Sequence, residues 1–354
     1  MDDRPDHRGG RRRSHHSDGY VMQAEAIDQA SIEGWWAREC PSARLPLTIR
    51  PILGGHSNLT FLVRDAHGTS WVLRRPPLGQ AAETAHDMAR EFRVQRSVQA
   101  IIPVPRMVGL ALDVLDVPFY VMERVDGVVI RTPQDALVLS PETRQEIGLG
   151  LVDTLARLHR VEPESVGLGD FGRPEGYVRR QLRRWPLQWQ AVGGRSIPVF
   201  DELQSRLAAT VPDQQRTAVI HGDFRLDNVM LDARHDVKAV LDWELSTLGD
   251  PLADFATMIA YWDDIGAGAP PATSVEGFPN ADEVIARYGD ESGLDLHQVY
   301  WYIAFAHWRL GCIAEGVYAR FRDNRMGGSP YSLDVLGAQS TLRAEAALAA
   351  LEEV

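Results

Sequence analysis

Two short motifs restrict the fold of this 354-residue chain more than any other feature. The first has the spacing His-x-Asp-x4-Asn and runs from His221 to Asn228. The second, Leu-Asp-Trp-Glu, places Asp242 at the end of an apolar stretch. Between them the sequence is typical of strand, polar turn and strand, so a hairpin should bring Asn228 and Asp242 side by side.

The residue types at these positions suit magnesium-dependent phosphoryl transfer. We expect Asp223 to be the catalytic base that accepts or orients the proton of an attacking hydroxyl, while His221 shapes the loop. Asn228 and Asp242 supply oxygen atoms, which Mg²⁺ prefers as ligands. Asp223 alone could equally cap a turn, but three positions at fixed separations favour a functional role. Glu244 could add a carboxylate near the metal or lie at the surface.

A glycine-rich loop upstream lies between two predicted strands, where a phosphate-covering loop is expected. Small residues there would let backbone N–H groups approach phosphate oxygens. The candidate nucleotide-binding residues of this loop are Gly54, Gly55, Ser57 and Asn58. Backbone groups near the junction of the two predicted lobes would meet the adenine ring, and the residues there are Met122, Glu123 and Val125.

Arg74 on the third strand stands where kinases place a lysine that contacts the α- and β-phosphates. We expect Glu91 on the following helix to be its partner, although a different pairing or a solvated Glu91 remains open. Lys238 is the only lysine among the 37 basic residues, so the exchange could reflect composition. A guanidinium is bulkier than an ammonium and binds phosphate as a fork.

The order of elements predicts an α+β, bilobal, protein-kinase-like fold with a small β-rich N-terminal lobe and a larger α-helical C-terminal lobe. We expect a disordered basic tail over residues 1–20 and a first helix with the ATP-binding lobe over 21–124. The helical lobe, with catalytic loop and acceptor site, should span 125–354. Strands are predicted near 48–53, 59–64, 70–74, 107–112, 119–123, 218–220, 229–231 and 239–241. Helices are predicted near 25–38, 81–100, 140–158, 175–190, 198–209, 249–262, 281–289, 295–320 and 331–353.

Composition excludes some classes of function. A net charge of −12 argues against a general nucleic-acid binder. Apolar stretches are interrupted well before the roughly 20 residues that a membrane span requires. Cys40 and Cys312 lack metal-binding spacing, which indicates reduced thiols in a cytoplasmic protein. The oligomeric state is not determined by these features.

Several further motifs have structural as well as functional interpretations. Asp170-Phe171-Gly172 spells a kinase metal motif but precedes the catalytic loop, so we interpret it as a loop turn. Asp250 should cap a helix, and Asp254 should brace the catalytic loop. The aromatic stretch 301–308 should be core. The basic cluster Arg179–Arg184 suits an exposed helix face or, less simply, a site for an anionic part of a substrate.

Taken together, these motifs resemble the aminoglycoside phosphotransferase, or choline-kinase-like, family. The resemblance covers nearly all of residues 45–320, and it is greatest to the kinase-like domains associated with acyl-CoA dehydrogenases. It rests on 54–58, 72–77, 90–91, 120–124, 221–228, 241–244 and 249–254. The resemblance implies ATP and Mg²⁺ as cofactors, Asp223 as base, and Asn228 and Asp242 as metal ligands. Arg74 departs from the wider kinase pattern, which has a lysine at this position.

The resemblance implies a small-molecule O-phosphotransferase but leaves the acceptor open between an aminoglycoside-like and a hydroxyacyl-CoA-like molecule. Two alternatives of other classes remain. The missing lysine would suit a nucleotide-binding pseudokinase module, although Asp223, Asn228 and Asp242 are all retained. A metal-dependent hydrolase could use the same carboxylates, but it leaves the glycine loop and Arg74 unexplained.

Overall fold

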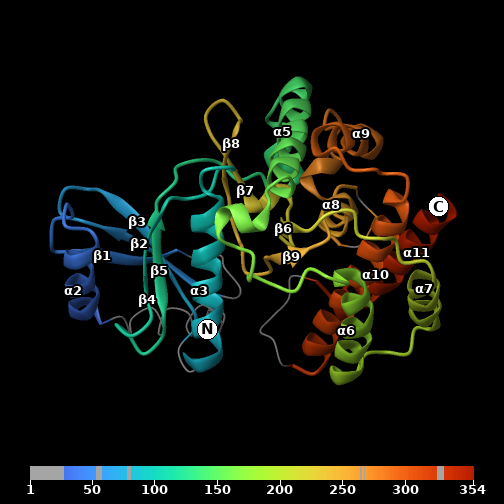
Figure 1. Cartoon of the computed structure of the whole chain (residues 1–354), viewed down its shortest axis with the longest axis horizontal. Coiled ribbons are helices and arrows are strands. Elements are labelled where there is room, and N and C mark those ends of the chain that lie inside the picture. Colours follow the sequence, from blue (N-terminus) through green and yellow to red (C-terminus); the bar gives the residue numbers. More distant parts are fainter. Residues whose placement is uncertain (1–27, 53–57, 78–80, 264, 267, 325–330) are drawn as a thin grey trace, which may run out of the picture.

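The structure is a computed structural model that describes residues 28–52, 58–77, 81–263, 265–266, 268–324 and 331–354. The expected tail over 1–20 and the loop residues Gly54, Gly55 and Ser57 lie outside these ranges. Within them, the predicted α+β, bilobal arrangement is present: a sheet-containing lobe lies beside a larger lobe made mainly of helices (Figure 1).

The N-terminal lobe is built on one five-stranded antiparallel sheet with the strand order β1-β2-β3-β5-β4. All five strands occur within two residues of the positions predicted from alternation. Their bounds are β1 (Thr48–Ile52), β2 (Leu59–Arg64), β3 (Ser70–Arg75), β4 (Met107–Ala111) and β5 (Phe119–Glu123).

Helices α2 (Gln29–Glu39) and α3 (Ala81–Val98) cover opposite faces of this sheet (Figure 1). On the α2 face, Trp36 meets Trp71 edge to face with ring centroids 5.4 Å apart. On the α3 face, Phe92 packs near Tyr120. Successive strand residues point to opposite faces, so Arg74 faces the α3 side while its neighbours in β3 are buried toward α2.

The C-terminal lobe is organised around one long, buried helix, α10 (Val299–Arg322), which packs against α8 and α11. Its aromatic stretch 301–308 is buried, as the sequence indicated. The other helices are α4 (Pro133–Leu137), α5 (Pro141–His159), α6 (Tyr177–Ala191), α7 (Pro198–Ala209), α8 (Pro251–Ala260), α9 (Ala281–Ser292) and α11 (Leu333–Glu352).

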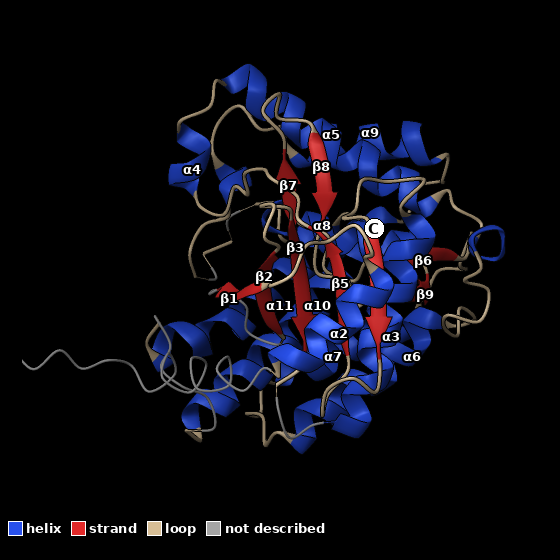
Figure 2. Ribbon diagram, turned by 90° about the vertical axis from the view of Figure 1, so that its left-hand side faces the viewer, coloured by secondary structure: helices blue, strands red, loops and turns tan. Residues whose placement is uncertain are grey.

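Two small two-stranded sheets flank the His221–Asn228 and Leu241–Glu244 motifs. The hairpin of β7 (Val229–Leu231) and β8 (Val237–Val240) forms as predicted, and the Leu241 backbone N–H donates to the Asn228 carbonyl at 2.8 Å. Strand β6 (Ala218–Ile220) pairs with β9 (Thr247–Gly249), a strand that the sequence analysis did not anticipate. These short strands lie among the helices in Figure 2.

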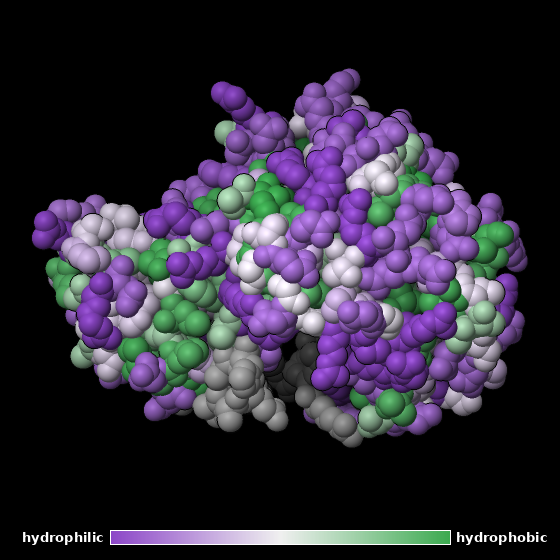
Figure 3. Space-filling model, viewed as in Figure 1, coloured by the Kyte–Doolittle hydropathy of each residue, from purple (hydrophilic) through white to green (hydrophobic). Residues whose placement is uncertain are grey.

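The face drawn in Figure 3 is mostly hydrophilic, with scattered hydrophobic residues. In the described part of the chain, no helix combines the length and apolar character needed to cross a bilayer.

Helix α5 offers a test of packing against the loop before α9. A Cβ placed on Gly148 would lie 2.4 Å from the ring of Pro279, whereas one on Gly150 would meet nothing within 4 Å. We expect Gly148→Ala to lower the free energy of unfolding by about 1–3 kcal/mol through overpacking. The matched Gly150→Ala should raise it by about 0.5–1 kcal/mol, because alanine favours the helix. Urea unfolding of both variants checks this, and equal effects would contradict the packing described.

Candidate active site

The catalytic loop lies between β6 and β7, and its own side chains hold Asp223 in place. The amide nitrogen of Asn228 donates to the backbone carbonyl of Asp223 at 2.9 Å and to its Oδ2 at 3.0 Å. Gly222 has a φ of +89° and a Cβ there would lie 2.8 Å from the Leu245 carbonyl oxygen, so this position requires glycine. The loop therefore presents the Asp223 carboxylate in one fixed orientation.

His221 is fully buried and links the catalytic loop to the strand that precedes Asp242. Its Nε2–H donates to the Leu241 carbonyl at 2.9 Å, and its Nδ1 accepts from the Asp223 backbone N–H at 3.3 Å. With one ring nitrogen donating and the other accepting, the partners define a neutral imidazole. His221 therefore shapes the loop, as expected from the sequence.

Asp254 on α8 holds the same loop through hydrogen bonds to its backbone. Its buried carboxylate accepts from the backbone N–H groups of His221 at 2.7 Å and Gly222 at 2.8 Å, and from His159 Nε2 at 3.1 Å. These donors hold the pKa of Asp254 below its usual value despite burial, with His159 and the backbone of His221 among the causes. Asp250 caps α8 through a 3.0 Å bond from the Leu252 N–H, so both expectations for this segment are confirmed.

Asp242 adopts a left-handed backbone conformation, with a φ of +64°. This region is uncommon for residues other than glycine and is often found at functional sites. The carboxylate faces β3, and its Oδ1 is 3.1 Å from Arg74 Nη2. Glu244 Oε2 is 3.7 Å from the same nitrogen. Two carboxylates therefore converge on one cation at this point.

Arg74 also forms the ion pair with Glu91 that the sequence suggested, with 3.2 Å between Nε and Oε2. Glu91 is buried and accepts from the Tyr120 hydroxyl at 2.8 Å and from Asn58 Nδ2 at 3.2 Å. Burial raises the pKa of Glu91 to about 7, although Arg74 and Tyr120 act in the opposite direction. Arg74 thus connects the N-terminal lobe to the catalytic motif.

Residues expected near the adenine ring lie where β5 leaves the sheet. Met122 is half-buried against the Met88 and Phe92 cluster, and Glu123 is exposed, with its carboxylate 3.1 Å from Arg106 Nε. The Glu123 backbone N–H donates to the Arg106 carbonyl at 2.8 Å. Val125 follows as a half-buried residue.

The donor set around Asp242 suits a hard divalent cation. In the described ranges no three His, Cys, Asp or Glu side chains form a metal-binding group. Mg²⁺ is commonly held by only one or two protein carboxylates together with water and substrate phosphates. Asp242 and Glu244 already approach one positive charge, and Asn228 uses its amide nitrogen for Asp223, which leaves its oxygen as a ligand. The residues present therefore fit Mg²⁺.

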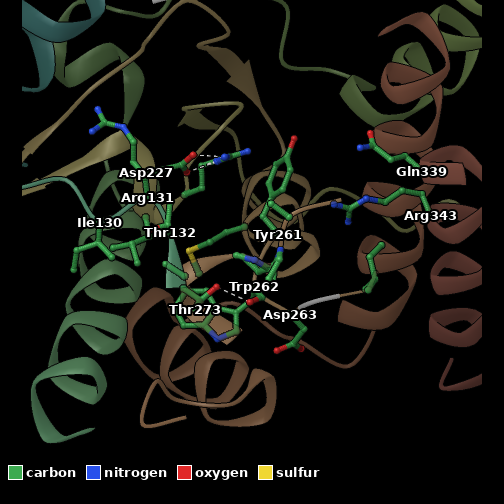
Figure 4. Close-up of a pocket in the computed structure, with 18 of the residues that line it drawn as sticks. Ile130, Arg131, Thr132, Asp227, Tyr261, Trp262, Asp263, Thr273, Gln339 and Arg343 are labelled. Atoms are coloured by element: carbon green, nitrogen blue, oxygen red, sulfur yellow. Dashed lines mark hydrogen bonds and ion pairs between the residues drawn. The ribbon is translucent and has the colours of Figure 1, made fainter. Parts of the chain in front are cut away.

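A pocket of about 460 Å³ opens in the helical lobe beside the catalytic loop (Figure 4). Residues 225–227, which follow Asp223 in the chain, line it together with Tyr261. The negative charge of Asp223 contributes to raising the pKa of Tyr261, although burial is the larger cause. Arg225 and Asp227, which line the pocket, are two and four residues from Asp223 in the chain. Burial raises the pKa of Asp223 itself, against the effect of the positive charge of Arg225.

The sequence analysis missed four residues around this pocket and loop: Arg225, Tyr261, Arg309 and Arg343. Arg309 is buried on α10 and donates to the Gly222 carbonyl at 3.4 Å and to Thr257 Oγ1 at 3.0 Å. Arg225 lies inside the His221–Asn228 motif but has no assigned role in it. Tyr261 directly follows α8, and Arg309 and Arg343 are isolated arginines on helices, without a motif around them.

Two other sequence features lie away from the pocket. Asp170 is exposed in a loop and pairs with Arg93, so Asp170-Phe171-Gly172 is a turn as interpreted. The basic cluster Arg179–Arg184 lies on α6, where Arg179, Arg183 and Arg184 are exposed. No member of that cluster lines the pocket.

Comparison with known sequences assigns the family. Residues 48–294 match the phosphotransferase enzyme family. Acyl-CoA dehydrogenase family member 11 from Homo sapiens is 37% identical over 320 residues and its Rattus norvegicus counterpart is 34% identical over 318. Each alignment covers 85% of this chain but only 40% of the relative. The chain belongs to the phosphotransferase enzyme family, in the branch that resembles these kinase-like segments.

Solved structures agree with this assignment. A Ralstonia eutropha protein described as an aminoglycoside phosphotransferase is 30% identical, with a TM-score of 0.80 over 92% of this chain and 98% of that one. A complex of another aminoglycoside phosphotransferase with AMP-PNP and hygromycin B has a TM-score of 0.59 at 19% identity, over 90% of this chain and 98% of that one, and shows the shared fold. The protein thus has the family assignment and the fold of the kinase-like phosphotransferases.

The buried cap of α8 should make stability depend on pH. Burial raises the pKa of Asp250 from its usual 3.8 to about 6, so the folded state retains a proton that the unfolded state releases between these values. The free energy of unfolding should therefore fall as pH rises from 4 to 6, by up to about 3 kcal/mol from this group. Asp250→Asn keeps the capping oxygen and removes this ionisation, so it should gain stability relative to wild type over that range. Urea unfolding at pH 4.5 and 7.5 measures the change.

The control for this experiment is Asp28→Asn, which alters the exposed cap of α2. Hydrogen bonds from Ser31 lower the pKa of Asp28, so its ionised form is favoured in the folded state. Its stabilising effect is present above the usual pKa and is lost as pH falls, which is the opposite sign. If Asp250→Asn changed the free energy of unfolding by the same amount at both pH values, the raised pKa of Asp250 would be contradicted.

Proposed function

We propose that the protein transfers the γ-phosphate of ATP, in the presence of Mg²⁺, to a hydroxyl of a small-molecule acceptor, with Asp223 as the base. The observation that carries this proposal is a convergence of residues distant in sequence. Asn228 is bonded to Asp223, and Asp242 lies 3.1 Å from Arg74 of the other lobe. A base, two metal-ligand candidates and a phosphate-binding cation therefore meet at one cleft.

Asp223 would receive the proton of the acceptor hydroxyl as the oxygen attacks the γ-phosphate. Kinase-type catalysis depends mainly on positioning and on stabilisation of charge. The bonds from Asn228 and the bracing by Asp254 supply the positioning in this chain. Mg²⁺ when bound, with Asn228 and Asp242 as its protein ligands, would neutralise charge on the phosphates.

The remaining candidate residues would hold the nucleotide. In this proposal the phosphates lie under the loop of Gly54, Gly55, Ser57 and Asn58, and the adenine lies beside Met122, Glu123 and Val125. Arg74 would contact the phosphates while Glu91 keeps it oriented. Its contacts with Glu91 and Asp242 support this arrangement, because they direct the Arg74 side chain from β3 toward the proposed metal ligand.

The alternatives explain less. A pseudokinase module does not require the fixed Asp223 and Asn228 pair, and a hydrolase that works without ATP does not require the Arg74 and Glu91 pair.

The acceptor is either aminoglycoside-like or hydroxyacyl-CoA-like, and it would enter through the pocket at Tyr261. We place the reaction in the cytoplasm, where the unbridged Cys40 and Cys312 would remain reduced.

Replacement of the base tests the reaction directly. We expect Asp223→Asn to reduce kcat about 10²–10⁴-fold, since the amide cannot accept the hydroxyl proton. Asp236→Asn makes the same chemical change at an exposed position of the β7–β8 turn and should retain activity. Phosphate transfer from Mg²⁺-ATP to a panel of hydroxylated aminoglycosides and hydroxyacyl thioesters is the measurement. Equal, negligible transfer by wild type and Asp223→Asn on every acceptor would contradict the proposal.

The role of Arg74 can be separated from that of the base. Arg74→Met should raise the KM for ATP at least tenfold, because it removes the cation that faces the phosphates, whereas Arg74→Lys keeps the charge and should lose less. Arg64→Met removes an exposed arginine from the end of β2 in the same sheet and serves as control. An unchanged KM in Arg74→Met would remove Arg74 from the nucleotide site.

A further inference from the structure

The pocket beside the catalytic loop has a charge arrangement that the proposed phosphoryl transfer does not by itself require. Three arginines line it, Arg131, Arg225 and Arg343, and they come from the segment before α4, the catalytic loop and α11. Its two described carboxylates belong to Asp227 and Asp263. Asp227 is already engaged, because it forms an ion pair with Arg225 (Figure 4).

Tyr261 brings two of these arginines together. The guanidinium carbon of Arg225 lies 4.6 Å from the centroid of the Tyr261 ring, and that of Arg343 lies 5.4 Å from it. In Figure 4, Arg343 extends from α11 toward Tyr261. Two guanidinium groups therefore share one aromatic ring, a contact that fixes each cation but neutralises neither.

Arg343 has only neutral hydrogen-bond partners among the described residues. Its Nη1 donates to the Ala260 carbonyl and approaches His307 Nδ1 at 3.1 Å. His307 is neutral, because burial and the nearby Arg343 lower its pKa to about 3. Burial and the charge of Arg225 also lower the pKa of Arg343. A largely buried cation beside a second cation is costly unless an anion balances it.

We propose that Arg343, held on Tyr261 beside Arg225, forms an anion-binding subsite that selects hydroxylated acceptors bearing a carboxylate or phosphate group. The inference rests on the proposed function, in that the pocket is taken to admit the acceptor. A guanidinium fork matches either anionic group through paired hydrogen bonds. The acceptor would place its anionic group against Arg343 and its hydroxyl toward Asp223, while the guanidinium fork of Arg225 stays on Asp227.

This subsite discriminates between the two acceptor classes. A polycationic aminoglycoside would bring its ammonium groups toward Arg343 and Arg225, and like charges in a partly buried site repel one another. An acceptor with an anionic group would instead supply the missing countercharge. Arg131, which is exposed at the rim, would attract such a molecule from solution.

Binding to the full chain tests the subsite with four probes that share a six-carbon chain and differ in charge. They are 6-hydroxyhexanoate, hexane-1,6-diol monophosphate, neutral 6-hydroxyhexanamide and cationic 6-aminohexan-1-ol. Titration calorimetry should give a Kd at least tenfold lower for one or both anions than for the amide, with the amine weakest. The two anions distinguish a carboxylate site from a phosphate site. Equal affinity for all four, no detectable anion binding, or preference for the amine would overturn the inference.

Variants then assign any selectivity to Arg343. Arg343→Gln should abolish the advantage of the anions over the amide, while Arg343→Lys should retain part of it. Arg206→Gln removes an exposed arginine of α7 and should change nothing. Thermal unfolding of each variant shows whether the fold is retained, and a folded Arg343→Gln that still prefers anions would contradict the assignment.

Phosphate transfer from Mg²⁺-ATP, measured on the same probes, separates the two proposals. Anion-selective binding without transfer to any probe or panel acceptor would leave the subsite intact and count against the phosphotransferase mechanism. Transfer to neutral and cationic acceptors without any preference for anions would retain the mechanism and overturn the subsite.

Discussion

The buried carboxylate of Asp254 is the interaction on which the catalytic region depends. It receives three hydrogen bonds, from two successive backbone N–H groups of the catalytic loop and from His159. Because each oxygen has a partner, the charge is tolerated inside the helical lobe. His221, in the same loop, bonds to the Leu241 carbonyl and so fixes the position of the residue before Asp242. One anchored loop therefore determines where both Asp223 and Asp242 are found.

Arg74 links the two lobes, because it contacts Glu91 in the N-terminal lobe and Asp242 in the C-terminal lobe. It is oriented by Glu91, which is in turn held by Tyr120 and Asn58, and it reaches across to Asp242. The pair of buried groups costs desolvation energy, which is why burial dominates the shift in the pKa of Glu91. A guanidinium has several donors in a rigid fork, so it can contact Glu91 and Asp242 at once. This geometry gives the arginine a physical use beyond a compositional replacement for lysine.

Most of the fold could be predicted because its signals are local. Strand alternation and capping residues such as Ser140 and Asp250 fix elements from a few neighbouring positions. Strand β9 was missed because Thr247–Gly249 lacks the apolar run of the other short strands, and its pairing with β6 depends on contacts across the intervening motif. The loop and hairpin residues of the candidate site were also accessible, since their spacing is fixed within one stretch. Tyr261 and Arg343 were not, because helix packing alone brings them to the pocket.

Two buried charges in the helical lobe differ in how completely they are partnered. Asp254 has its donors within the chain, so its role is structural. Arg343 lies beside another arginine, and its described partners are a carbonyl, a neutral imidazole and an aromatic ring. Burial of a charge without a countercharge lowers stability. Such a site is understandable if a ligand completes it, so the incompletely balanced charge, more than the catalytic motif, carries the information on what this phosphotransferase accepts.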